Sequence, residues 1–300
     1  MQQFSKLVDM ENPELVMDEV RIIVSMIFPD FDFEQVNRVF KDVVKLFHGE
    51  YPGYRACNTE YHDLRHTSDA TLAFTRLIHG AVLAGESLSR EDIGLGIIAT
   101  LLHDTGYIQT VDDDTGTGAK YTMSHIQRSI EFMDKYFAEN GFSREHFNKC
   151  SDMLKCTGLN TKIDNMKFVS PETELQGKML GTADLLGQMA DRTYLEKLLF
   201  LFYEFREAGI QDYESELDFL SKTIGFYEFT KKRFAGELGG VTKYLSGHFK
   251  ARFNIDRDLY ENAMEGNIQY LKHTLKHNEK DYRDGFRRAG LVDKLKENGL

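Results

Sequence analysis

Apolar residues recur at three- and four-residue spacing along most of the chain, whereas the strict alternation typical of β-strands is rare. The clearest case is residues 33–47, which predict a helix with one apolar face formed by Val36, Val39, Phe40, Val43 and Phe47. Only four prolines occur in 300 residues. We therefore predict an all-α fold.

The same spacing predicts further helices along the chain. They are expected at residues 93–102, from Thr122 or Ser124 to about Phe137, within 142–165, around Asp184, at 194–205 and at 256–277. Alternating charges in the last of these helices fit a solvated outer face or, as the alternative, a homodimer contact.

The net charge of the chain argues against some classes of binding partner. The formal charge of -11 and the pI near 5.4 argue against binding to nucleic acid polymers or anionic membranes, because both require basic surfaces. The N-terminal residues lack a signal-peptide pattern, and no run of about 18 apolar residues is present. We expect a soluble, cytoplasmic protein.

The three cysteines, Cys57, Cys150 and Cys156, are an odd number in a long chain. A disulfide framework is therefore not expected. We predict that they are small buried hydrophobic residues.

The first candidate for chemistry is the pair His62 and His66. After a turn at residues 51–54, Asn58 or Thr59 is expected to cap a helix that carries both histidines. Residues four apart share a helix face, so the two rings would lie close together. They are either two satisfied polar groups or part of a metal or catalytic site.

His103 and Asp104 follow a strongly apolar helix that Gly106 is expected to end. A charged Asp against so apolar a helix is costly unless a cation compensates it, although a surface cap is the alternative. Asp184 lies in a similar apolar setting. His125, in the first turn of its helix, either faces the same ion or serves as a cap or surface residue.

These separated segments resemble the ordered motifs of the HD-domain metal-dependent phosphohydrolases. The resemblance rests on Tyr61-His62-Asp63-x-x-His66-x-x-Asp69, Leu102-His103-Asp104 and Ala183-Asp184-Leu185, and the first spacing is most similar to the cyclic-nucleotide phosphodiesterase branch. It covers roughly residues 50 to 235. It implies an HD-domain, phosphodiesterase-like helical bundle with its core at 51–235, an N-terminal helical extension at 1–50 and a C-terminal helical extension at 236–300.

The resemblance also implies roles for individual residues. The ligands of a first metal ion would be His66, His103, Asp104 and Asp184, and Asp104 would reach a second ion. His62 matches the general acid, and Asp69 matches a carboxylate beside the metal site. The cofactors implied are one or two divalent ions, among Zn, Mn, Fe, Co, Ni and Mg.

Three positions depart from the phosphodiesterase pattern. Tyr107 replaces a histidine after the HD pair, so the second ion site is altered or is completed by His125. Asp63 replaces the usual Asn beside the general acid. Thr223 replaces a base-reading Gln, whereas Phe226 keeps the base-stacking face, which weakens specificity for cyclic nucleotides.

The predicted function is metal-dependent hydrolysis of a small-molecule phosphoester, such as a nucleotide or a cyclic-nucleotide-like diester. A metal-bound hydroxide would attack phosphorus. One alternative is an HD-type diiron oxygenase, which would need His125 and Fe. The other is a catalytically silent regulatory module that binds a nucleotide.

Overall fold

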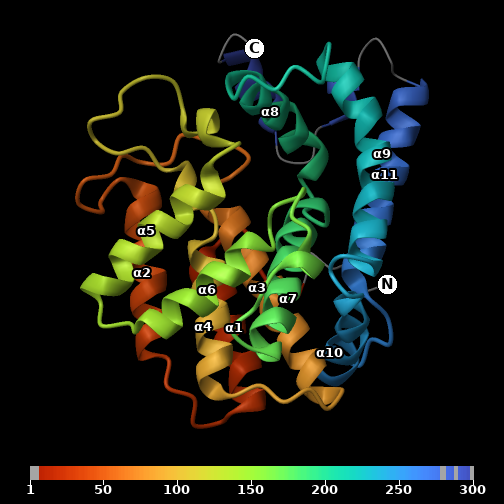
Figure 1. The fold of residues 1–300 in the computed structure, drawn as a ribbon. Helices are drawn as coiled ribbons and strands as arrows, with labels where there is room; N and C mark the ends of the chain where they lie inside the picture. Colours follow the sequence, from red (N-terminus) through yellow and green to blue (C-terminus); the bar gives the residue numbers. More distant parts are fainter. Residues whose placement is uncertain (1–6, 278–281, 287–289, 298–300) are drawn as a thin grey trace.

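The computed structural model describes residues 7–277, 282–286 and 290–297. These residues form helices and connecting turns, with no β-strand and one isolated antiparallel bridge between Tyr54 and Thr110. The prediction of an all-α fold is confirmed (Figure 1).

The α-helices have the following bounds: α1 Pro13–Ile27, α2 Glu34–His48, α3 Leu64–Leu83, α4 Arg90–Leu102, α5 His125–Glu139, α6 Arg144–Lys155, α7 Pro171–Met189, α8 Tyr194–Glu207, α9 Glu216–Ala235, α10 Tyr244–Phe253, α11 Leu259–His277 and α12 Leu291–Glu297. All five residues of the apolar face predicted for α2 are buried. Short 3-10 turns occupy several connections, including Thr105–Tyr107.

Helix α3 lies at the centre of the molecule, in contact with α1, α4, α7 and α10. Every residue from His66 to Ala81 is buried, although several are polar. Thr71 and Thr75 each donate a hydroxyl hydrogen bond of 2.8 Å to the carbonyl oxygen one turn earlier. Since these hydroxyls are satisfied within the helix, α3 can be enclosed on all sides without a fully apolar sequence.

Both predicted extensions pack on the helices of the predicted core. Helix α1 of the N-terminal segment and α10 of the C-terminal segment contact α3. Asn267 of α11 donates its amide to the carbonyl oxygens of Met189 (3.0 Å) and Asp191 (2.9 Å), where α7 ends. Figure 1 shows α9 and α11 side by side along one flank. The boundaries near residues 50 and 235 stay a prediction.

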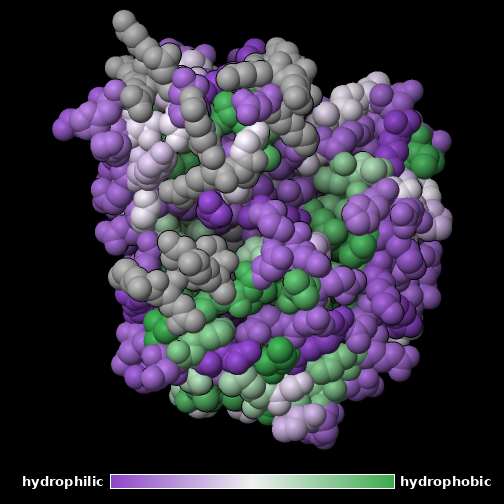
Figure 2. All heavy atoms as spheres, turned by 180° about the vertical axis from the view of Figure 1, so that it is seen from behind, coloured by the Kyte–Doolittle hydropathy of each residue, from purple (hydrophilic) through white to green (hydrophobic). Residues whose placement is uncertain are grey.

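The surface is mostly hydrophilic on the face that Figure 2 presents, with short apolar stretches between polar ones. Among the described helices, none has both the length and the apolar character needed to cross a bilayer.

The cysteines are unpaired. Cys150 and Cys156 are buried, as predicted, whereas Cys57 is only partly buried. Its thiol lies 3.2 Å from the Thr59 hydroxyl oxygen.

The contact between α3 and α10 depends on Gly80. A Cβ atom at this position would lie 1.9 Å from the carbonyl oxygen of Tyr244, on the backbone of α10. We expect Gly80→Ala to force the two helices apart and to lower the free energy of unfolding by about 1–3 kcal/mol in urea denaturation. Gly225 of α9 is the matched control, because a Cβ added there would have no atom within 4 Å. Gly225→Ala should raise stability by about 0.5–1 kcal/mol, and equal stability of the two variants would contradict this packing.

Candidate metal centre

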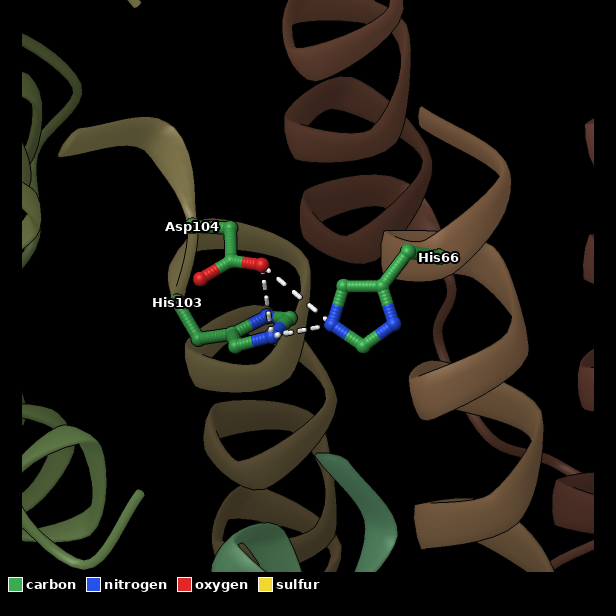
Figure 3. A group of neighbouring side chains, drawn as sticks. All are labelled: His66, His103 and Asp104. Atoms are coloured by element: carbon green, nitrogen blue, oxygen red, sulfur yellow. Dashed lines mark hydrogen bonds and ion pairs between the residues drawn. The ribbon is translucent and has the colours of Figure 1, made fainter. Parts of the chain in front are cut away.

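Two imidazoles and a carboxylate converge beside the central helix. His66 lies in the first turn of α3, and His103 and Asp104 directly follow α4. Figure 3 shows the two rings and the carboxylate pointing toward one another. His66 Nε2 lies 3.3 Å from His103 Nε2 and 3.2 Å from Asp104 Oδ2. All three side chains are buried, and together they could hold a metal ion.

Asp184 of α7 adds a fourth side chain. Its Oδ1 lies 3.1 Å from His66 Nε2 and 3.7 Å from His103 Nε2. The approach of α7 to α3 depends on Gly187, because a Cβ there would lie 2.9 Å from the backbone nitrogen of Ala70. Gly187 lies about one turn after Asp184 on α7, and Ala70 lies about one turn after His66 on α3. The close contact between Gly187 and Ala70 therefore brings the Asp184 carboxylate next to the His66 ring.

The distances between these atoms suit one common ion. Adjacent ligands at about 2.1 Å from a metal are separated by about 3.0 Å in octahedral geometry and about 3.4 Å in tetrahedral geometry. The separations that involve His66 Nε2 or His103 Nε2 range from 3.1 Å to 3.7 Å. Imidazole nitrogen together with carboxylate oxygen is a ligand set for divalent transition metals.

The hydrogen bonds around His103 leave its inner nitrogen free to act as a ligand. His103 Nδ1 donates to the Thr100 carbonyl oxygen at 2.8 Å, so Nε2 of the neutral ring directs a lone pair into the cluster. Asp104 Oδ2 is buried and makes no hydrogen bond in the described part of the chain. Acceptors that face one another repel unless a proton on His66 or a metal cation lies between them, so these residues fit a metal ion.

The electrostatics of the cluster favour positive charge. Burial alone would lower the pKa of His66, but Asp104 and Asp184 raise it. Burial would likewise raise the pKa of both carboxyl groups, yet His103 and His66 hold them below the ordinary value for Asp. Both carboxyl groups are therefore anionic near neutral pH, which suits them to bind a cation.

The prediction that His62 and His66 share a helix is wrong. Helix α3 begins at Leu64, and the carboxylate of Asp63 caps it by accepting the His66 backbone N–H at 2.7 Å. Asp is a strong N-cap residue, whereas Asn58, which was expected to cap, donates its amide to Gln109 instead. His62 lies in the preceding turn, with its ring centroid 6.2 Å from that of His66.

Glu204 of α8 holds the His62 ring. Its Oε2 lies 2.9 Å from His62 Nδ1, and its Oε1 accepts the backbone N–H groups of Glu60 (2.9 Å) and Tyr61 (2.8 Å). Both side chains of the pair are buried. Sequence reasoning missed Glu204, which is 142 residues from His62. The only signal was a lone acid within the apolar run of residues 198–205.

The ring of Tyr107 contacts two histidines, whose own centroids lie 6.4 Å apart. It stacks on His62 at a centroid distance of 4.1 Å and on His125 at 4.7 Å. His125 Nδ1 lies 2.6 Å from the Thr122 carbonyl oxygen, and its Nε2 lies 4.0 Å from Asp104 Oδ1. Burial lowers the pKa of His125, so its ring is neutral near neutral pH and presents a nitrogen lone pair to Asp104. Its role as a ligand stays a prediction.

Gly106 allows the first turn of α5 to pack against the backbone next to His103 and Asp104. A Cβ at Gly106 would lie 2.0 Å from the His125 carbonyl oxygen, so a larger residue would push His125 away. The Ser129 hydroxyl accepts the Gly106 N–H at 2.8 Å and donates to the His103 carbonyl oxygen at 2.6 Å. Gly106 was expected to end a helix, but α4 already ends at Leu102 and Gly106 lies in a 3-10 turn.

Gln188 is a second polar neighbour that sequence reasoning missed. Its amide nitrogen donates to Asp184 Oδ1 at 2.9 Å and lies 3.4 Å from His66 Nε2. Its amide oxygen lies 3.2 Å from the Tyr61 hydroxyl, which donates to it. The spacing of four residues after Asp184 on one helix was the available signal.

Asp69 is buried one turn beyond His66, and burial raises its pKa. It is not bonded to a predicted ligand, since neither Asp69 Oδ1 nor His66 Nδ1 has a hydrogen-bond partner among the described residues. Its Oδ2 lies 3.9 Å from Arg65 Nε, within an ionic network that also includes Asp191. Its predicted role beside the metal stays a prediction.

The two predicted substrate residues lie on α9. Thr223 is buried and donates its hydroxyl to the Phe219 carbonyl oxygen at 3.0 Å, while Phe226 stacks on Phe229 at 6.1 Å. Within the described ranges, no hydrogen bond or ring contact joins either residue to the histidine–aspartate cluster. Their roles in binding a base stay predictions.

The chain matches the Npun_R2479-like family over residues 40–237, a stretch that includes His62, His66, Asp104, Asp184 and Glu204. It matches no curated protein. The match spans more than half of the 300 residues, so the chain belongs to the Npun_R2479-like family.

Proposed function

We propose that this protein is a metal-dependent hydrolase of a small phosphoester. The observation that carries the proposal is the convergence of His66, His103, Asp104 and Asp184 at ligand-like separations, with His62 beside them. The order of these residues also resembles that of HD-domain phosphohydrolases. A nucleotide or a cyclic-nucleotide-like ester in the cytoplasm is the substrate class that we infer.

The four side chains would hold a divalent ion, which when bound activates water and offsets charge on phosphate oxygens. His62 would protonate the leaving oxygen. Because Glu204 accepts from Nδ1, the exchangeable proton of an imidazolium at this position would be at Nε2, on the ring edge toward Tyr107. The carboxylate of Glu204 also stabilises the charged ring and fixes its orientation.

The position of His125 favours a site with room for a second metal ion. Its Nε2 faces Asp104 Oδ1, while Asp104 Oδ2 faces His66 and His103. A carboxylate in this position can bridge two ions. The same arrangement is compatible with a diiron oxygenase, so oxygen consumption by the iron-loaded protein is the assay that separates the two functions.

Loss of a ligand should remove the metal. We expect protein purified without chelators to contain divalent metal, and we expect His103→Ala and Asp104→Ala to lose both that metal and phosphoesterase activity. Elemental analysis and a panel of nucleotide and chromogenic phosphate esters measure the two effects. His48→Ala is the control, because His48 is an exposed histidine at the end of α2. Activity that persists in metal-free Asp104→Ala protein would refute the proposal.

Removal of the proposed general acid, His62, should lower turnover without changing the metal content. We expect His62→Ala to lower kcat by about 10²- to 10⁴-fold, with metal content near that of the wild type. Glu204→Gln should lower kcat less, since the amide oxygen can still accept from Nδ1 but no longer forms an ion pair with a charged ring.

The control for Glu204 lies on the same helix. Glu207 bonds to Thr117 rather than to His62, so Glu207→Gln should leave kcat unchanged. If His62→Ala loses bound metal, His62 is a ligand and its assignment as the acid is wrong.

A further inference from the structure

A cavity of about 200 Å³ lies where α7, α9 and α11 meet the turn at residues 240–242. Leu186 of α7 contributes to its wall. Two residues along a helix differ in direction by about 200°, so Leu186 and Asp184 point to opposite sides of α7. The cavity is therefore separate from the metal centre.

The size of the cavity limits the ligand. An apolar cavity of about 150 Å³ is large enough for a benzene ring, whereas sites for drug-sized molecules start at about 300 Å³. A cavity of about 200 Å³ therefore suits a ligand with a single ring and a short side chain.

The inner wall of the cavity is apolar and aromatic. Leu186, Phe234 and Met264 are buried, and they come from three different helices. Tyr227 adds an aromatic ring that is 6% exposed. These side chains suit the hydrocarbon part of a ligand, because contact with them removes it from water.

The charged part of the lining is acidic. Asp258 and Glu261 lie at the start of α11, against the single basic side chain of Lys231. Burial raises the pKa of Asp258 to about 6, so this carboxyl group is still anionic near neutral pH. Its Oδ1 accepts the backbone N–H groups of Tyr260 (2.8 Å) and Glu261 (3.3 Å). No ion pair joins Asp258 to a basic side chain in the part of the chain that the structure describes.

Lys231 does not neutralise this carboxylate. It is exposed, and its ammonium lies 5.7 Å from the centroid of the Tyr227 ring. This distance is within the range of a cation–π contact, so the Tyr227 ring can face a positive charge. A partly buried carboxylate beside aromatic side chains is the environment that a protonated amine prefers.

We infer that this cavity binds a small organic cation, a primary amine carried on one aromatic or aliphatic ring. The ring would contact Leu186, Phe234 and Met264, and the ammonium would pair with Asp258. The site needs no metal, so it does not depend on the proposed hydrolysis.

Calorimetric titration of the full chain tests this inference, with 2-phenylethylamine and its uncharged analogue 2-phenylethanol as probes. At about pH 8, where Asp258 is ionised and the amine is protonated, the amine should bind roughly tenfold more tightly than the alcohol. Equal binding of the two probes, or no binding of either, would overturn the inference.

Two variants locate the binding. Asp258→Asn keeps a side chain that can cap α11 but removes the charge, so it should abolish the preference for the amine. Ala235→Phe, at the exposed rim of the cavity, should block both probes. Glu265→Gln is the matched control, because Glu265 is an exposed acid of α11 outside the lining. A preference for the amine that survives in Asp258→Asn would show that Asp258 is not its partner.

Discussion

The backbone contact between α3 and α7 at Gly187 is the constraint on which the rest of the centre depends. It fixes the spacing between the two helices that supply His66 and Asp184, so that an imidazole and a carboxylate lie 3.1 Å apart. A second connection lies nearby, where Arg65 Nη2 pairs with Asp191 Oδ1 at 2.8 Å. Together, the two contacts hold the start of α3 against the end of α7.

Burial of two carboxylates in the metal centre costs free energy, and neighbouring residues reduce this cost. The carboxylates of Asp104 and Asp184 are largely removed from water, which is unfavourable unless positive charge or hydrogen bonds compensate. Asp104 faces two imidazoles, and Asp184 also accepts the amide N–H of Gln188. Near the start of α3, Arg65 and Lys197 form a separate network of ion pairs with Asp191.

Much of the helical fold could be predicted from periodicity alone, as the buried apolar face of α2 and the position of the HD pair directly after α4 show. A helix that carries His66 was predicted, but its burial on all sides was not, because hydroxyl groups such as those of Thr71 and Thr75 bond within the helix and leave no apolar pattern. The position of His62 could not be predicted either, since several residues compete to cap one helix and only the folded structure shows that Asp63 does so.

Contacts between residues far apart in the chain could not be predicted from the sequence either. Nothing local in the chain connects Glu204 with His62, and their contact exists only because α8 packs beside the turn that precedes α3. The grouping of His66, His103, Asp104 and Asp184 was expected from the resemblance, and the structure brings these side chains together. Their binding of metal stays a proposal.

The amide of Asn267 gives the C-terminal segment a role in the helix that carries Asp184. The family match ends at residue 237, yet Asn267 satisfies two carbonyl oxygens where α7 ends. Helix ends leave such oxygens without partners inside the helix. The Asp191 oxygen also accepts the Tyr194 backbone N–H at 3.1 Å, but a relative that has only the matched region would have to replace the bond to the Met189 oxygen with water or with a different side chain. Divergence beyond the shared region can therefore change the rigidity of α7 while every residue of the centre stays the same.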